Sequence, residues 1–88
     1  DFLSMIKDKI KLSKDINLEV LYDFLITQFD SMKYDKKDGL KLIWNDKWIH
    51  VRSSNTEPIV RIIAESKTLE TTGSLIKETK NNINKFFN

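Results

Sequence analysis

Between Leu40 and Glu65 the chain alternates apolar and polar residues in three successive runs. The runs are 40–44, 48–52 and 59–65. Alternation with a period of two is typical of half-buried strands, and Asn45-Asp46 is a short polar connection that favours a hairpin. Three consecutive strands joined in this way predict an antiparallel meander. The polar stretch at 35–39, which precedes the first run, is expected to be a turn.

Helical periodicity flanks the meander on both sides. Asn17 is a good N-cap with the acid Glu19 behind it, and apolar residues recur at helical spacing as far as Met32, over about four turns. A second helix is expected to begin near Thr68. The expected buried faces are Leu18, Leu21, Tyr22, Leu25, Phe29 and Met32 in the first helix, and Thr72, Leu75, Ile76, Thr79, Ile83, Phe86 and Phe87 in the second.

One further strand is expected before the first helix. The run from Lys9 to Ser13 alternates, and its lysines suit the wet side of an edge strand. Residues 1–6 are ambiguous, because their apolar positions suit a short helical segment or a linker. The order strand-helix-strand-strand-strand-helix predicts an α+β two-layer sandwich, with an antiparallel sheet and both helices on one face.

The opposite face of this sheet is expected to stay partly open. By parity its occupants are Trp48, His50, Arg52 and Arg61.

Length and composition exclude several classes of function. The chain has 88 residues, which allows one domain and no deep enclosed active site, because domains usually need about 100 residues each. It has no cysteine, which removes disulfides and thiolate chemistry and fits the cytoplasm. No apolar run approaches the ~20 residues of a membrane span. The net charge of +2 gives no reason to expect nucleic acid as a partner. The start at Asp1 without Met is what a domain cut from a longer protein would show.

The densest polar segment runs from Arg52 to Glu57, between two expected strands. Hydroxyls, an amide, free backbone N–H groups and a guanidinium are together the donors that bind a phosphate or a carboxylate. Glu57 fits such a site only if it accepts from a hydroxyl or orients an arginine. The competing interpretation is an ordinary polar turn, because Ser, Asn and Thr favour turns without any ligand. Arg61, in the next strand, favours the anion site.

Other candidate residues have simpler interpretations. His50 could be a general base, but no nucleophile lies at a suitable spacing, so a half-exposed sheet histidine is favoured. Trp44 and Trp48 could stack on sugars or bases, but strand aromatics usually pack, and packing is favoured for Trp44. The carboxylates of Asp35, Asp38 and Asp46 are best explained as turn residues, since no calcium-loop pattern is present. The lysines of the last helix are expected to be a solvated face.

The sequence around the polar segment resembles the C-terminal domain of the α-D-phosphohexomutases, that is, the phosphoglucomutases, phosphomannomutases and phosphoglucosamine mutases. The resemblance is carried by Asp38-Gly39-Leu40-Lys41-Leu42, by Trp48-Ile49-His50-Val51-Arg52-Ser53-Ser54-Asn55-Thr56-Glu57-Pro58 and by Arg61-Ile62-Ile63-Ala64-Glu65. The R-x-S-N-T-E-P run is specific. The first thirty residues resemble the family only in layout.

This resemblance implies a TATA-binding-protein-like fold and a place at the end of a four-domain, cytoplasmic mutase. Such enzymes interconvert hexose 1-phosphates and 6-phosphates through a phosphoserine and Mg²⁺, both of which belong to earlier domains. Carried over by position, Arg52, Ser54, Asn55 and Thr56 would bind the substrate phosphate, and Arg61 would assist. The implied partners are a glucose or mannose phosphate and the other domains, and the isolated domain would not be catalytic. Asn55, where some relatives have Gly, favours the phosphoglucomutase/phosphomannomutase branch.

A function of another class stays open at this point. The chain could be a stand-alone module that binds anions or nucleic acid with Trp48, Arg52 and Arg61 on the open face. A nucleic-acid module would show a steep salt dependence because it contacts many phosphates, and the balanced charge argues against it.

Overall fold

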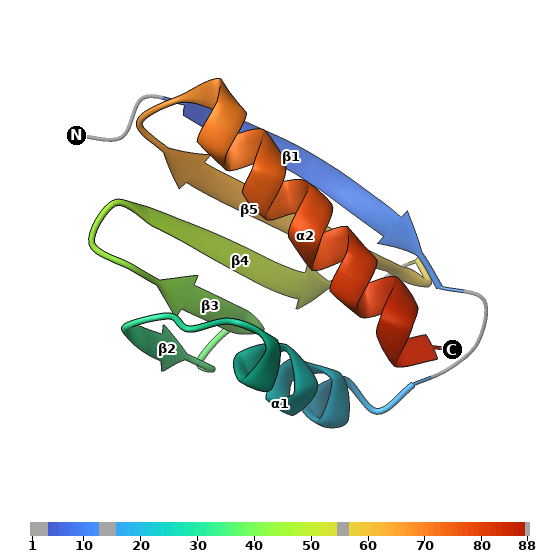
Figure 1. The fold of residues 1–88 in the computed structure, drawn as a ribbon. Helices are drawn as coiled ribbons and strands as arrows, with labels where there is room; N and C mark the ends of the chain where they lie inside the picture. Colours follow the sequence, from blue (N-terminus) through green and yellow to red (C-terminus); the bar gives the residue numbers. More distant parts are fainter. Residues whose placement is uncertain (1–3, 13–15, 55–56, 88) are drawn as a thin grey trace.

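The computed structural model describes residues 4–12, 16–54 and 57–87. Within them five strands and two helices follow one another along the chain (Figure 1). Their bounds are β1 Ser4–Lys11, α1 Leu18–Gln28, β2 Lys33–Asp35, β3 Leu40–Ile43, β4 Lys47–Ser53, β5 Ile59–Ser66 and α2 Leu69–Phe87. The strands form one antiparallel sheet in the order β1-β5-β4-β3-β2. The predicted α+β architecture is confirmed.

The meander forms as the alternating runs predict. Adjacent strands β3, β4 and β5 pair antiparallel, with Leu42 opposite Ile49 and Val51 opposite Ile62. The hairpin between β3 and β4 closes through a hydrogen bond from the Trp44 backbone N–H to the Lys47 carbonyl, 2.9 Å long. All the apolar residues of these pairs are buried, so hydrophobic alternation fixes the register.

The first strand begins earlier than predicted. Strand β1 starts at Ser4 and ends at Lys11, so residues 4–6 belong to the sheet and are not a linker or helical segment. The reason is non-local: β5 is eight residues long and pairs with β1 along its whole length, from Ser4 opposite Ser66 to Lys11 opposite Ile59. The predicted edge position is confirmed, because β1 pairs only with β5.

The first helix ends earlier than predicted, and an unpredicted strand follows it. Helix α1 begins after Asn17, whose side-chain oxygen accepts from the backbone N–H groups of Glu19 and Val20, as expected of an N-cap. It ends at Gln28, so Phe29 and Met32 are not part of its buried face. The chain is extended from there, because Met32 and β2 pair with the free edge of β3.

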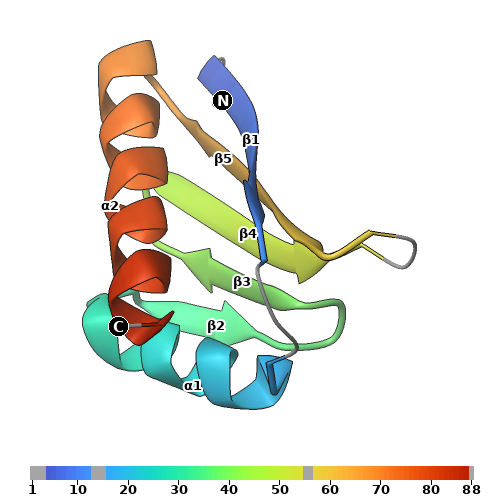
Figure 2. The same cartoon turned by 90° about the vertical axis from the view of Figure 1, so that its right-hand side faces the viewer.

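Both helices pack on one face of the sheet and share one core (Figures 1 and 2). Helix α2 runs across β1 and β5, and α1 lies at the other end of the sheet near β2 and β3. Thr68 caps α2: its side-chain oxygen accepts from the Thr71 backbone N–H, as the predicted start near Thr68 requires. The buried core residues are Leu21, Tyr22, Leu25, Leu40, Leu42, Ile49, Val51, Val60, Ile62, Ala64, Leu75, Ile76 and Ile83.

The other face of the sheet carries the polar residues that parity assigned to it. Along β4 the buried Ile49 and Val51 alternate with residues that are half-buried or exposed, and along β5 Arg61 is exposed between two buried neighbours. The residues of these two strands that face away from the helices are Trp48, His50, Arg52, Ile59, Arg61, Ile63 and Glu65.

Candidate anion-binding site

Two arginines stand side by side where the meander ends in its polar loop. Arg52 on β4 and Arg61 on β5 are direct partners in the sheet register, and both are exposed on the open face. Figure 2 shows this end of β4 projecting away from α2. Directly opposed residues in an antiparallel pair have Cβ atoms roughly 4.5–5.5 Å apart, so one anion can reach both guanidinium groups.

Backbone hydrogen bonds fix both ends of the loop that joins the arginine-bearing strands. The Ser54 N–H donates to the Ile59 carbonyl at 3.0 Å, and the Ile59 N–H donates to the Glu57 carbonyl at 2.8 Å. The Leu12 N–H donates to the Pro58 carbonyl at 2.6 Å, which ties the loop to the end of β1. Of the predicted phosphate ligands, Ser54 therefore lies next to Arg52 at the mouth of the loop, while Asn55 and Thr56 lie outside the described residues.

An acid from another turn contacts the first arginine. The Asp38 carboxylate lies 3.3 Å from a guanidinium nitrogen of Arg52, and both side chains keep much of their surface in water, 67% and 45% exposed. From the sequence, Glu57 fits the site only if it accepts from a hydroxyl or orients an arginine. Within the described residues Glu57 forms no ion pair. Asp38 is 14 positions before Arg52 in the chain, and only the pairing of β3 with β4 brings the two together.

Gly39 allows this turn to lie against β4. Its φ is +74°, in the left-handed region, and an added Cβ would lie 2.4 Å from the Val51 carbonyl oxygen and 2.8 Å from the Arg52 Cβ. Only glycine fits such a close backbone approach at this φ. The backbone of the Asp38-Gly39 turn is thereby held beside Arg52, which explains why the guanidinium meets Asp38.

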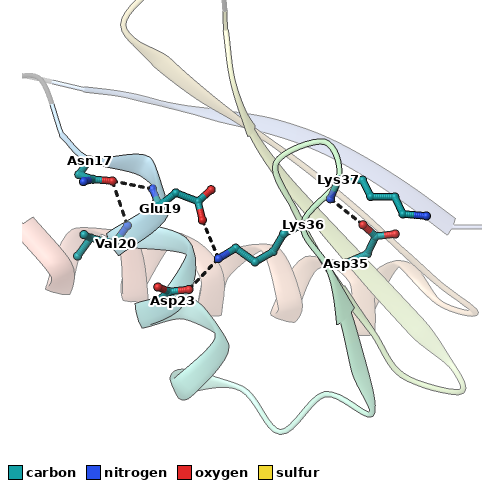
Figure 3. Close-up of polar contacts among 7 residues, drawn as sticks. All are labelled: Asn17, Glu19, Val20, Asp23, Asp35, Lys36 and Lys37. Carbon is teal, nitrogen blue, oxygen red and sulfur yellow. Dashed lines mark hydrogen bonds and ion pairs between the residues drawn. The ribbon is translucent and has the colours of Figure 1, made fainter.

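The same turn is tied to helix α1 by a lysine (Figure 3). The Lys36 Nζ lies 2.7 Å from a Glu19 carboxylate oxygen and 2.9 Å from one of Asp23. These two carboxylates, Glu19 first, hold the pKa of Lys36 above its usual value. The Asp35 carboxylate accepts from the Lys37 N–H at 2.7 Å and closes the turn locally.

Helix α1 also supports the start of the loop. Burial raises the pKa of Tyr22 in α1, and a hydrogen bond from the Ser53 backbone acts in the opposite direction. Tyr22 is only 5% exposed, so the end of β4 rests on a buried side chain. The arginine on this strand end is therefore carried by a fixed backbone.

The remaining open-face candidates are engaged in contacts within the sheet. The His50 Nε2 contacts the Asp38 backbone carbonyl, in keeping with a sheet histidine. The Trp48 Nε1–H donates to the Glu65 carboxylate at 3.2 Å, and the Lys41 ammonium lies 4.6 Å from the Trp48 ring centroid. Trp44 packs edge-on against Phe29, with ring centroids 5.9 Å apart, which confirms its packing role.

The described part of the chain offers no group of three or more His, Cys, Asp or Glu side chains that could hold a metal ion. Asp38 acts there as a turn residue, through its contacts with Arg52 and His50. Asp35, predicted to be a turn residue, is instead the last residue of β2, and its carboxylate accepts from the Lys37 N–H. A separate finding is that neither helix of the described residues is long and apolar enough to cross a membrane.

The comparisons with known proteins agree on one family. The family model described as "Phosphoglucomutase/phosphomannomutase, C-terminal domain" matches residues 8–81. A phosphoglucosamine/phosphogalactosamine mutase of Sulfurisphaera tokodaii is 36% identical over 78 residues, 86% of this chain and 17% of the relative. A probable phosphoglucosamine mutase of Methanobrevibacter smithii is 40% identical over 79 residues, 84% of this chain and 18% of the relative.

A third relative covers only part of the chain. The phosphoglucomutase/phosphomannomutase of Thermococcus kodakarensis is 53% identical over 38 residues, 43% of this chain and 8% of the relative. The chain thus spans less than a fifth of the length of these curated relatives. The family match, which covers the arginine pair and all of the sheet except the first residues of β1, shows that the chain belongs to the phosphoglucomutase/phosphomannomutase family, as its C-terminal domain.

Proposed function

We propose that this domain binds the phosphate group of a hexose or hexosamine phosphate for a phosphohexomutase. The ligands are the Arg52 and Arg61 guanidinium groups together with Ser54, Asn55 and Thr56 of the loop. The observation that carries the proposal is the direct pairing of Arg52 with Arg61 on the exposed face, beside that loop. Guanidinium groups and backbone N–H groups are the donors that bind phosphate best.

The proposed role is to anchor the substrate, while other parts of the protein carry out the chemistry. A mutase that moves a phosphoryl group between two positions of one sugar needs a fixed hold on the phosphate that does not react. A site on paired strands meets this need, because its donors stay in place while the sugar takes either orientation. The phosphoserine and Mg²⁺ of the proposed parent enzyme would lie in other domains, and the described residues do not fit a magnesium site.

The proposal names hexose and hexosamine phosphates as a class of substrate and does not choose one sugar. The relatives are named as mutases of amino sugars and as mutases of glucose and mannose phosphates. The Asn55 position had favoured the glucose and mannose branch, but the relatives with the widest coverage are named for amino sugars. A phosphate site discriminates little between these sugars, because it contacts the group that they share.

The test is an NMR titration of the ¹⁵N-labelled chain with glucose 1-phosphate, mannose 1-phosphate and inorganic phosphate. We expect the three ligands to shift the same amides, between Arg52 and Thr56 and at Arg61, with affinities in the millimolar range because one loop makes few contacts. Unphosphorylated glucose serves as the control and should leave these amides unshifted. Shifts that cluster elsewhere on the domain would contradict the proposal.

The same titration at two salt concentrations separates the alternative function. A single phosphate site loses affinity only modestly with added salt, whereas a nucleic-acid surface loses it steeply because it releases many counterions. A steep loss for a short oligonucleotide, with tighter binding than any sugar phosphate, would favour the nucleic-acid module.

A further inference from the structure

A third cation extends the arginine pair across the sheet. Lys9 on β1 is the direct register partner of Arg61, which is in turn the direct partner of Arg52. All three side chains are exposed. Directly opposed residues on antiparallel strands lie on the same face, so Lys9, Arg61 and Arg52 form one straight row, called here the cation row.

The charge of the cation row is balanced at only one end. Asp38 pairs with Arg52, whereas neither Lys9 nor Arg61 has an ion pair among the described residues. Asp8, the neighbour of Lys9, is on the opposite side of β1, where its carboxylate lies 3.0 Å from the Lys80 ammonium of α2. Like charges placed directly opposite each other destabilise a sheet. The ligand-free domain therefore keeps two unneutralised cations side by side at a cost in stability.

The surface is hollowed beside these two cations. A hollow of about 230 Å³ is lined by Lys7, Asp8, Lys9 and Arg61. Three of its four lining side chains are cationic, and Lys80 neutralises the fourth. The hollow lies beside the middle of β1, where Lys9 is opposite Arg61, and the pair of Lys11 and Ile59 lies between it and the loop. An anion held by Arg61 therefore has both room and a second positive charge on the β1 side.

We propose that Lys9 is a further phosphate-binding residue of this domain. The ligand is a phosphate dianion held by Arg61, and Lys9 contributes the charge from the β1 side that Arg52 contributes from the β4 side. This inference rests on the proposed function and extends its site to a strand outside the polar loop. Such a ligand would also give the like charges of the cation row a function, because a bound dianion neutralises them.

The experiment compares four forms of the chain: the native sequence, Lys9→Gln, Lys9→Arg and Lys77→Gln. Lys77 is the matched control, because it is exposed on α2, on the other side of the sheet, and its replacement removes the same net charge. The affinity for inorganic phosphate is measured by NMR titration at constant ionic strength. We expect Lys9→Gln to weaken phosphate binding about three-fold, Lys9→Arg to restore it, and Lys77→Gln to leave it unchanged.

Thermal unfolding of the same variants separates a binding role from a structural one. If Lys9 serves anion binding and not stability, Lys9→Gln should unfold, in the absence of phosphate, at a temperature equal to or higher than that of the native chain. The reason is that its repulsion with Arg61 is removed. A lower melting temperature together with unchanged phosphate affinity would overturn the inference. Equal phosphate affinity of Lys9→Gln and Lys77→Gln would also overturn it, and the proposed function would stand if Arg52→Gln still lost binding. A native chain that binds no phosphate would overturn both the inference on Lys9 and the proposed function.

Discussion

At the scale of single residues, Gly39 determines how the candidate site is presented. Its left-handed backbone and the absence of a Cβ allow the Asp38-Gly39 turn to lie against Val51 and Arg52 of β4. The Asp38 carboxylate is thereby brought to the Arg52 guanidinium, and the Asp38 carbonyl to His50. One residue without a side chain therefore decides which polar groups surround the first arginine.

Replacing this glycine should be costly. Gly39→Ala forces an L side chain to a φ of +74° and places its Cβ against backbone, so we expect a loss of at least about 2 kcal/mol in the free energy of unfolding, measured with urea. The control is Gly73→Ala in α2, where the added Cβ meets only the Ile6 Cδ1 at 3.9 Å. That change should stabilise the domain by about 0.5–1 kcal/mol, because alanine is the better helix residue. Similar effects at the two glycines would contradict this account.

At the scale of the elements, the edge strand β1 is held to α2 by polar bonds as well as by the core. The Thr72 hydroxyl is fully buried and lies 2.8 Å from the Ser4 carbonyl and 2.6 Å from the Ser66 hydroxyl. Further along, Lys80 pairs with Asp8. An edge strand has only one neighbour in the sheet, so these bonds add the attachment that a second neighbour strand would provide.

The buried threonine provides a test of this attachment. Thr72→Val keeps the shape but removes the hydroxyl that donates to the Ser4 carbonyl, while the Ser66 hydroxyl still donates to the Thr68 carbonyl, so we expect a loss of about 1–3 kcal/mol in urea unfolding. Thr79→Val is the matched control, since the Thr79 hydroxyl is equally buried but donates only to the Leu75 carbonyl of its own helix, 2.8 Å away. It should cost less than Thr72→Val, and hydrogen exchange of the β1 amides should rise only in Thr72→Val. Equal losses would show that Thr72 does not secure β1.

The ion pair between β1 and α2 predicts part of the acid sensitivity. The hydrogen bond with Lys80, and secondly that with the Lys9 N–H, lowers the pKa of Asp8 below its ordinary value of 3.8. A depressed pKa in the folded state means that the stabilisation is present above the unfolded-state pKa and is lost as the pH falls through the folded one. Between pH 6 and pH 3 the native chain should therefore lose more stability than Asp8→Asn does.

The difference should be small, about 0.2–1 kcal/mol, because both side chains of the pair are more than a third exposed. It is measured as the change in urea unfolding free energy with pH in the two forms. Parallel pH profiles would show that the pair contributes nothing.

The local hydrophobic pattern of the sequence was sufficient to predict some strands and helices and insufficient to predict others. The alternation of β3, β4 and β5 predicted the meander and the residues of its open face, because a period of two assigns each side chain to one face. The three residues of β2 carry no such pattern: Lys33 and Tyr34 are exposed, and only pairing with β3 makes them a strand. Phe29 and Met32 continue the helical spacing of α1, yet Phe29 packs on Trp44 and Met32 pairs with β3.

The residues of the candidate site also fall into two groups: those that the sequence predicts and those that only the pairing of the strands brings together. The loop and its arginines could be proposed from composition and from the family resemblance, because they are contiguous or nearly so in the sequence. Asp38 and Lys9 could not, since their proximity to Arg52 and Arg61 depends on which residues pair across the sheet. Strand register is set by burial of the whole meander and is not encoded in any short motif.

At the scale of the whole molecule, cations gather on one face of the sheet. The net charge of +2 conceals an open face that collects cations on all five strands, with Asp35 and Glu65 as the strand acids among them. The cations are Lys7, Lys9, Lys11, Lys33, Lys41, Arg52 and Arg61. The α1 acids Glu19 and Asp23, in turn, form ion pairs with Lys36. A nearly neutral domain can therefore still present a field that attracts a phosphate at one place.

We propose that Arg52 focuses this field on one phosphate. The direct measurement is the affinity of the native chain, Arg52→Gln and the control Lys77→Gln for glucose 1-phosphate, followed by NMR with the fold of each variant checked by its amide spectrum. We expect Arg52→Gln to lose about ten-fold or more in affinity, as expected for removal of a charge-assisted bond, and Lys77→Gln to stay within about two-fold of the native chain. A folded Arg52→Gln that binds glucose 1-phosphate as well as the native chain would contradict it.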